Sequence, residues 1–326
     1  MRDLRTLPKA HLHLHLEAAM RPATMEELAL EAGVATPVTS GFTDFTEFGQ
    51  LYQGLLAVFG VKENILRVLD EAVADAAADG AVHVEFGGAP LYHAAVFGSA
   101  EAALGALLDQ AAESSQEHGV SVGFMPTLNR MADPEAMMET ALLAAKYAGR
   151  GVVGLGLAND ERGFPPGPFA ACFAVAKDAG LLSTPHAGEL DGPSSVRGAL
   201  DALQADRILH GVRAVEDPSL LEEIAERGVC LDVCPTSNLQ LGVVPTLEAH
   251  PLPQLLDAGV RCSINADDPT LFGPGLLEEY ELSRTVLGLS DEQLAACAWS
   301  SIECSAATDD VKQRSKGAVD AWLAAS

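Results

Sequence analysis

An alternating stretch near the start of the chain reads His11-Leu12-His13-Leu14-His15-Leu16-Glu17. Strict alternation is typical of a β-strand, because successive side chains of a strand point to opposite faces. The leucines then share one face and the three imidazoles share the other. Such a row of imidazoles is costly inside a protein unless something binds it, and imidazole is a common ligand of zinc-like ions. We therefore interpret this stretch as part of a metal site, with hydrogen-bonded structural histidines as the alternative.

The composition of the chain narrows its possible partners. The 326 residues are 48% hydrophobic, which is enough for one large barrel or two modest domains. Acidic residues outnumber basic ones by 46 to 20, which gives a formal charge of −26. Such a charge opposes binding to a nucleic-acid backbone or to an anionic membrane. We therefore expect neither nucleic acid nor membrane as a partner.

Targeting and redox patterns point to a cytoplasmic protein. The start of the chain lacks an apolar leader segment, and no apolar run reaches the length of a membrane span without a charge. The six cysteines form no C-x-x-C pair and are expected to be reduced thiols. We expect a soluble, cytoplasmic protein.

Helical and extended patterns alternate along the rest of the chain. Helices are expected at 20–35, 42–60 and 61–79, and the aromatic-rich second one could form a lid or a pocket wall. Seven further strands are expected at 81–86, 119–125, 151–157, 181–186, 206–210, 229–233 and 260–265. The remaining helices are expected at 99–117, 133–148, 168–179, 192–204, 217–228, 252–258, 275–287, 290–300 and 308–324.

Eight strands that alternate with helices predict a (β/α)₈ TIM barrel. We expect it to form a single domain over residues 1–326, with extra helices after the first strand and at the C-terminus. A doubly wound open sheet is the alternative, but no G-x-G-x-x-G follows the first strand to support it.

Side chains that suit metal binding gather at the expected strand ends, where such barrels carry their chemistry. Two histidines end the first strand, His13 and His15, while His186 ends the fifth and Asp267 follows the eighth. Together they form a three-nitrogen, one-oxygen set that suits Zn²⁺ and leaves a place for water. His11 lies deeper by its strand position and is expected to be an ordinary core histidine.

Proton-transfer groups end the same strands. Glu189 and His210 are candidates for proton transfer and water orientation, since a bound zinc ion supplies hydroxide near neutral pH. The Asp-Asp-Pro sequence places one carboxylate, Asp267, on the metal and a second, Asp268, beside it. Asp267 thus belongs to the catalytic set as well as to the metal set.

The chain resembles the adenosine deaminase family within the amidohydrolase superfamily. Six segments carry the resemblance, occur in family order and span nearly the whole chain. They read Leu7-Pro-Lys-Ala-His-Leu-His-Leu-His-Leu-Glu17, Leu157-Ala-Asn-Asp-Glu161, His186-Ala-Gly-Glu189, Arg207-Ile-Leu-His-Gly211, Val233-Cys-Pro-Thr-Ser-Asn238 and Asn265-Ala-Asp-Asp-Pro269. The resemblance implies a metal-dependent (β/α)₈ hydrolase that holds one zinc ion per chain.

The resemblance also implies a reaction, the hydrolytic deamination of a small 6-aminopurine nucleoside, adenosine or 2′-deoxyadenosine. Hydroxide would add to C6 and ammonia would leave. Glu189 would donate a proton to purine N1, His210 would orient the attacking water and Asp268 would hydrogen-bond N7. No lysine ends the fourth strand, so the resemblance implies one metal ion and no carbamylated lysine bridge.

Departures from the family pattern bear on the substrate. Glu17-Ala18 replaces the usual Asp-Gly near the ribose 5′ position, where Glu17 and His15 are expected to contact substrate. Asn159 replaces a usual glycine, and its backbone amide would still face purine N3. Adenine and 6-amino-6-deoxyfutalosine, which has a carboxylated 5′ extension, are the alternative substrates. Glu17 would repel that anion unless Arg162 or Arg21 compensates.

Two other classes of function stay open. A metal phosphoesterase is one, because His-x-His barrels also hydrolyse phosphate esters, usually with two or three metal ions. A non-enzymatic purine-binding or scaffold protein is the other, and it predicts the loss of a metal ligand, Glu189 or His210. All of these residues are present, so we expect the deaminase.

Overall fold

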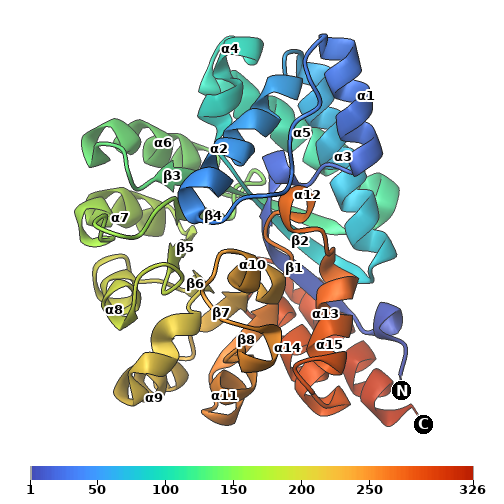
Figure 1. The fold of residues 1–326 in the computed structure, drawn as a ribbon, viewed down its shortest axis with the longest axis vertical. Helices are drawn as coiled ribbons and strands as arrows, with labels where there is room; N and C mark the ends of the chain where they lie inside the picture. Colours follow the sequence, from blue (N-terminus) through green and yellow to red (C-terminus); the bar gives the residue numbers. More distant parts are fainter. Residues whose placement is uncertain (1, 326) are drawn as a thin grey trace.

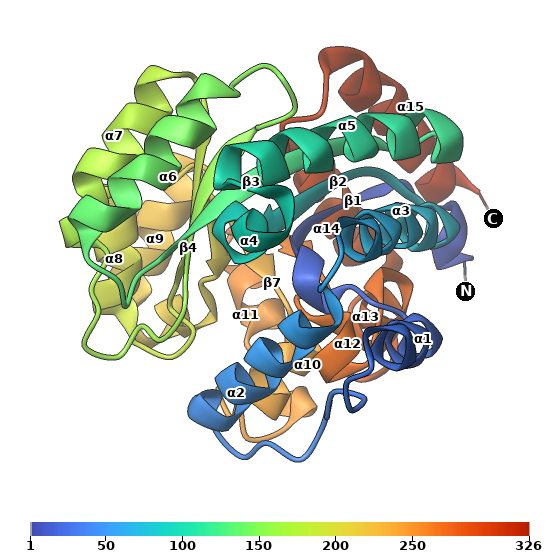
Figure 2. The same cartoon turned by 90° about the horizontal axis from the view of Figure 1, so that it is seen from above.

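Eight parallel strands follow one another in chain order around one sheet in the computed structural model, which describes residues 2–325. The strands are β1 (Lys9–His15), β2 (Ala81–Gly88), β3 (Ser121–Asn129), β4 (Gly154–Ala158), β5 (Leu182–Ala187), β6 (Arg207–His210), β7 (Cys230–Val233) and β8 (Arg261–Ile264). Two backbone hydrogen bonds of 3.0 Å, from His15 N to the Asp267 carbonyl and from Asp267 N to the His13 carbonyl, join the end of β8 to β1. They nearly close the sheet, and the predicted TIM barrel is confirmed (Figures 1 and 2).

Helices surround the strands and supply the outer layer of the core (Figure 1). They are α1 (Pro22–Ala32), α2 (Phe45–Leu55), α3 (Lys62–Ala78), α4 (Ala94–Phe97), α5 (Ala100–His118), α6 (Pro134–Lys146), α7 (Ala170–Asp178), α8 (Pro193–Ala202), α9 (Pro218–Arg227), α10 (Pro235–Gln240), α11 (Leu252–Asp257), α12 (Pro269–Phe272), α13 (Leu276–Thr285), α14 (Asp291–Glu303) and α15 (Asp309–Ala324). The two ends of the chain lie together, where the Arg2 guanidinium donates to the Ala325 carbonyl (Figure 2).

Most predicted elements begin and end within a few residues of the observed ones. Three short helices, α4, α10 and α12, were not predicted. Within residues 2–325 no single helix is long and apolar enough to cross a membrane. The segments Pro90–Phe97 and Ala100–His118 reach that length and composition only together, across a bend of 101°.

A register shift in β1 corrects the prediction for the alternating stretch. His11 pairs with Val84 of β2 whereas Leu14 pairs with Phe86, so β1 has one residue more than β2 over this interval. Such a bulge reverses which face the following side chains occupy. His11 therefore lies beside Leu14 in a cavity of about 750 Å³ that is separate from the cavity described below. His11 and His13 do not share one face, although His11 is buried as expected.

A charged cluster fills the barrel below the strand ends. The Arg207 guanidinium donates to Glu85 at 2.5 Å and to Asp232 at 2.9 Å, and all three side chains are buried. Buried charges persist when they are paired and hydrogen-bonded. Ser263 donates to the second oxygen of Asp232 at 2.7 Å, so this floor links β2, β6, β7 and β8. It supports the strand ends that carry the site.

Candidate metal and catalytic site

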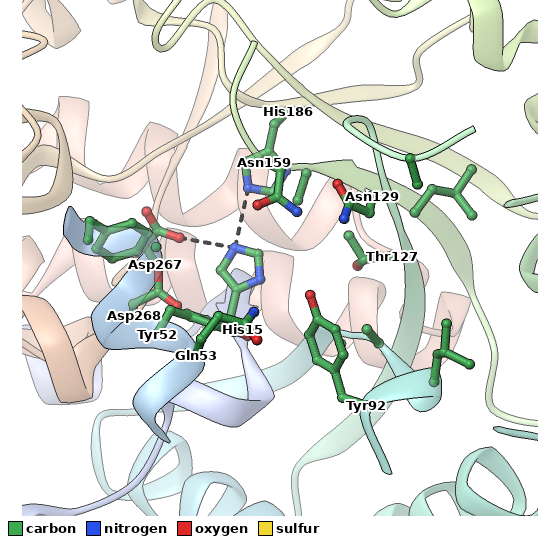
Figure 3. A pocket seen from close by; sticks show the side chains of 18 of the residues that line it. His15, Tyr52, Gln53, Tyr92, Thr127, Asn129, Asn159, His186, Asp267 and Asp268 are labelled. Atoms are coloured by element: carbon green, nitrogen blue, oxygen red, sulfur yellow. Dashed lines mark hydrogen bonds and ion pairs between the residues drawn. The ribbon is translucent and has the colours of Figure 1, made fainter. Parts of the chain in front are cut away.

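Four predicted ligands meet at the carboxyl ends of β1, β5 and β8. His13 Nε2 lies 3.1 Å from His186 Nε2 and 3.1 Å from Asp267 Oδ1. His15 Nε2 lies 3.3 Å from His186 Nε2 and 3.2 Å from the same Asp267 oxygen (Figure 3). Ligand atoms that surround one tetrahedral ion at about 2.0–2.1 Å stand about 3.3 Å apart. These four distances fit a shared metal ion, and the ligand atoms of the region fall into two overlapping groups, His13, His186, His210 and Asp267 in one and His15, Asp267 and Asp268 in the other.

The protonation of the imidazoles also fits a cation. His13 Nδ1–H donates to the Asp232 carbonyl at 3.1 Å, and His186 Nδ1–H donates to the Leu157 carbonyl at 3.0 Å. Neutral rings with a proton on Nδ1 have only a lone pair on Nε2. Two lone pairs that face each other at 3.1 Å repel unless a cation lies between them, so these residues could hold a divalent metal ion.

His210 lies beside the predicted ligands, and its side chain offers a ligand atom within 4.8 Å of those of His13, His186 and Asp267. Its Nε2 is 3.7 Å from Asp267 Oδ2 and 3.4 Å from Glu189 Oε1. Burial lowers its pKa to about 3, so the ring is neutral at pH 7. A neutral imidazole beside a metal site can hold a proton toward a water molecule, the role that the sequence predicts for His210.

Unusual backbone conformations mark the site. Four non-glycine residues among 2–325 have a left-handed φ, and three of them are Asn159 (86°), His210 (67°) and Asp267 (63°). Each such residue costs about 1–3 kcal/mol, and strain of this kind gathers at active sites. The surrounding structure holds these three residues at the ends of β4, β6 and β8, where they reach the same cavity.

Glu189 is held by the backbone of its own loop. The carboxylate of Glu161 accepts hydrogen bonds from Gly188 N at 2.9 Å and from Glu189 N at 3.0 Å. Gly188 has a φ of 69°, and a side chain there would collide with Val196. Burial raises the pKa of Glu189 well above its ordinary value, and the charge of Asp267 adds to the effect. Burial therefore favours the protonated form of Glu189, whose side chain lines the cavity.

Asp268 is a second buried acid in the same cavity. Its Oδ1 has no hydrogen-bond partner among the described residues, and its side chain is 3% exposed. Burial raises its pKa well above the ordinary value, and the neighbouring charge of Asp267 raises it further. An unpartnered buried carboxyl costs free energy, which a ligand with a complementary group can recover. Asp268 is therefore suited to bind a polar ligand atom.

The cavity between these groups has a volume of about 300 Å³, at the lower end for small-molecule sites. Helix α2 provides an aromatic wall through Phe45, Phe48 and Tyr52, one of the two roles considered for residues 42–60. Tyr92 and Asn129 line the side opposite the metal ligands (Figure 3). None of the described residues that line the cavity is a lysine or an arginine.

Glu17, which is predicted to contact the substrate, is buried and bonded to residues around the cavity. Glu17 is 1% exposed and does not line the cavity. Its carboxylate accepts hydrogen bonds from the Tyr52 hydroxyl at 3.0 Å and from His93 Nε2 at 3.0 Å. Because Tyr52 lines the cavity, this hydrogen bond makes Glu17 a support of the cavity wall. His15 and Asn159 do line the cavity, as predicted.

Sequence reasoning gave no role to several residues that support the site. Glu161 and Asn238 lie in two of the segments that resemble the family. Their place in those segments was the only feature of the sequence that could have indicated a role. Arg130 donates to the His186 carbonyl at 2.6 Å, and His250 donates to Asn238 at 3.1 Å. Neither has a sequence signal, because their partners come from other strands or across a long loop.

The chain matches known proteins over almost its whole length. The family model described as adenosine deaminase matches residues 8–322. A putative adenosine/adenine deaminase of Streptomyces coelicolor is 42% identical over 340 residues, covering 100% of this chain and 99% of that protein. An aminodeoxyfutalosine deaminase of Acidothermus cellulolyticus is 36% identical over 338 residues, covering 98% of this chain and 94% of that protein.

Solved structures agree with these relatives. The adenine deaminase of Arthrobacter aurescens superposes with a TM-score of 0.91 at 31% identity, covering 98% of this chain and 99% of that one. An amidohydrolase of Burkholderia ambifaria with bound Zn superposes with a TM-score of 0.85 at 26% identity, covering 99% of this chain and 94% of that one.

Proposed function

The chain belongs to the adenosine deaminase family, and on that premise we propose that it hydrolyses adenine to hypoxanthine and ammonia with one zinc ion. One observation carries the proposal. Three of the four candidate metal ligands, His15, His186 and Asp267, line a cavity of about 300 Å³ together with two buried acids, Glu189 and Asp268. A hydrolytic deamination needs a water site, a proton donor and a group that holds the base, and this cavity supplies each.

His13, His15, His186 and Asp267 would hold the zinc ion, which when bound supplies hydroxide at neutral pH. The residues around it then divide the proton transfers. Glu189 donates its proton to purine N1, so that C6 becomes open to attack by water. The N1 proton stays on the product, and the Glu189 carboxylate then takes the proton of the new C6 hydroxyl group and passes it to the amino group, which leaves as ammonia.

Three further groups orient the base and the water. The Asp268 carboxyl donates a hydrogen bond to purine N7, which relieves its unpartnered state. The backbone amide of Asn159, a residue that lines the cavity, donates to N3. His210 presents Nε2 toward the attacking water. Hydrogen bonds to a purine edge discriminate strongly, because an analogue without the matching atom leaves buried groups unpaired.

The charges of the side chains that line the cavity favour an uncharged substrate. Glu189, Asp267 and Asp268 line the cavity and no lysine or arginine among the described residues does. The two arginines considered as counter-ions are paired elsewhere, Arg21 with Asp75 at 2.6 Å and Arg162 with Asp160 at 2.8 Å. A phosphate or carboxylate on the substrate would meet acids without a compensating cation. This disfavours AMP, 6-amino-6-deoxyfutalosine and phosphate esters.

The state of Glu17 supports the free base over the nucleoside. The family resemblance places an acidic side chain at this position near the ribose 5′ group, but Tyr52 and His93 occupy the Glu17 carboxylate. Adenosine and 2′-deoxyadenosine are the second candidates. Neutral polar side chains of Gln53, Thr127 and Asn129 line the rest of the cavity and could accept a sugar hydroxyl.

Ammonia release from the zinc-loaded protein tests the proposal. The substrates are adenine, adenosine, 2′-deoxyadenosine, AMP and 6-amino-6-deoxyfutalosine, with Glu189→Gln as the inactive control. We expect the highest kcat/KM on adenine and the lowest on the two anions. No release from adenine by protein that contains one zinc per chain would refute the proposal, and a preference for AMP would refute the argument from charge.

A further inference from the structure

We propose that His250 is a positioning residue that selects the tautomer of His210 through the side-chain amide of Asn238. The inference rests on the proposed function for its kinetic consequences, but the tautomer itself can be observed without a substrate. His250 follows the 3₁₀ turn Leu247–Ala249 and precedes α11, and it does not line the cavity. It is 3% exposed.

The chain of hydrogen bonds starts at a group whose direction is fixed. The backbone N–H of Leu252 donates to His250 Nδ1 at 3.1 Å. A backbone amide can only donate, so Nδ1 of His250 must be the unprotonated nitrogen. Burial lowers the pKa of His250 to about 4, so the ring is neutral at pH 7 and carries its one proton on Nε2.

The proton on His250 Nε2 then determines how the Asn238 amide is turned. His250 Nε2–H donates to Asn238 Oδ1 at 3.1 Å, which places Asn238 Nδ2 3.2 Å from His210 Nδ1. The amide is a donor on one side and an acceptor on the other. With the amide flipped, its NH₂ would face the Nε2–H of His250, and two donors would meet in a fully buried place.

The orientation of the amide in turn decides which nitrogen of His210 is protonated. Asn238 Nδ2–H donates to His210 Nδ1, so that nitrogen is an acceptor and the neutral ring carries its proton on Nε2. His210 Nε2–H then points toward Glu189 Oε1 at 3.4 Å and Asp267 Oδ2 at 3.7 Å, the side on which the attacking water would be held. A flipped amide would favour the other tautomer and present a lone pair there.

Asn238 is buried, and its backbone is held in place. Its side chain is fully buried on α10, and its backbone carbonyl accepts from Val243 N and Val244 N at 2.9 and 3.2 Å. The backbone of Asn238 is therefore held by the loop that leads to His250. Removal of the His250 donor would leave the two orientations of the amide nearly equivalent, so His210 would lose its single tautomer.

The test compares His250→Leu, His250→Gln and His250→Asn in zinc-loaded protein. Glutamine can place an amide N–H close to the position of Nε2, whereas asparagine is too short and leucine has no donor. His118→Leu is the matched control, because His118 bonds Asp70 on the outer helices and lines none of the cavity. Proton–nitrogen correlation spectra of ring-labelled histidines report the tautomer of His210, with His210→Asn used to assign its signals.

We expect wild type and His250→Gln to show a proton on His210 Nε2, and His250→Leu and His250→Asn to show both tautomers. With adenine, we expect kcat of His250→Leu to fall about 10–100-fold, as for other residues that orient a site side chain. We expect KM to change less than about twofold, because the contacts to the base remain. Zinc content should stay at the wild-type level.

An unchanged His210 spectrum in His250→Leu overturns the proposal, as does a kcat for His250→Gln no better than that for His250→Asn. If His250→Leu does not fold, the glutamine and asparagine variants decide the question alone. If the wild type releases no ammonia from adenine, the proposed function fails, and the nitrogen spectra still decide whether His250 selects the tautomer.

Discussion

Replacement of Arg207 by methionine tests how the barrel floor supports the site. Arg207, Glu85 and Asp232 are fully buried, and the guanidinium also donates to the Cys304 carbonyl at 3.0 Å. Methionine matches much of the length of arginine but carries no charge. The Arg207→Met variant would keep two buried carboxylates without their cation. Loss of one partner of a buried ion pair costs about 3–5 kcal/mol of unfolding free energy.

The pKa of Glu85 gives an independent magnitude. Burial alone would raise it, but Arg207 and His83 lower it to about 2 from an ordinary 4.5. This depression contributes about 3 kcal/mol of stability at 1.36 kcal/mol per pKa unit. That stability is fully present above pH 4.5 and is lost as the pH falls through 2. In Arg207→Met, burial without the guanidinium raises the pKa of Glu85. The free energy of unfolding of the variant should therefore increase as the pH is lowered from 7 to 5.

Urea unfolding of the zinc-loaded protein, followed by far-ultraviolet circular dichroism at pH 7 and pH 5, measures both effects. Lys177→Met is the control, because its pair with Asp206 is partly exposed and worth at most about 1 kcal/mol. We expect Arg207→Met to lose about 3–5 kcal/mol at pH 7 and to recover part of it at pH 5. A loss below about 1 kcal/mol with wild-type pH dependence would refute the reasoning.

Three further changes test the site itself. Glu189→Gln should lower ammonia release from adenine about 10²–10⁴-fold with zinc retained, because it removes the general acid, and near-normal turnover would contradict that role. Asp267→Asn should lower the zinc content after dialysis, measured by metal analysis, because it removes the one anionic ligand; Asp44→Asn, a surface helix cap, is the control. Glu161→Gln should lower kcat about 10–100-fold by releasing the loop of Glu189, and a rate equal to wild type would exclude that support.

Much of the fold follows from local patterns. Each strand and its helix are marked by their own periodicity, so the eight repeats could be counted without any long-range information. The bulge in β1 could not be predicted in this way. It depends on the register between β1 and β2, which pairs His11 with Val84 and Leu14 with Phe86 across more than 70 residues. Helix α10 was also missed, since its six residues are too few for a periodic signal.

The residues of the candidate site also fall into those that local patterns could indicate and those that depend on tertiary contacts. The metal ligands and Glu189 could be proposed because each ends a strand, and a barrel brings all strand ends to one rim. The fate of Glu17 could not, because the partners that bury it, Tyr52 and His93, come from a helix and a turn elsewhere in the chain. A side chain that can reach a cavity in one arrangement is sealed in another by neighbours that only folding supplies.

The sequence by itself determined the barrel and the class of chemistry and indicated the candidate metal ligands, because these depend on residue types at the ends of recurring local elements. The tertiary structure alone decided which acids face the cavity, that no lysine or arginine among the described residues lines it, and how Asn238 and His250 meet His210. The reason is physical. Charge, burial and hydrogen-bond direction belong to sets of side chains from separate strands and loops, and such sets exist only after the chain has folded.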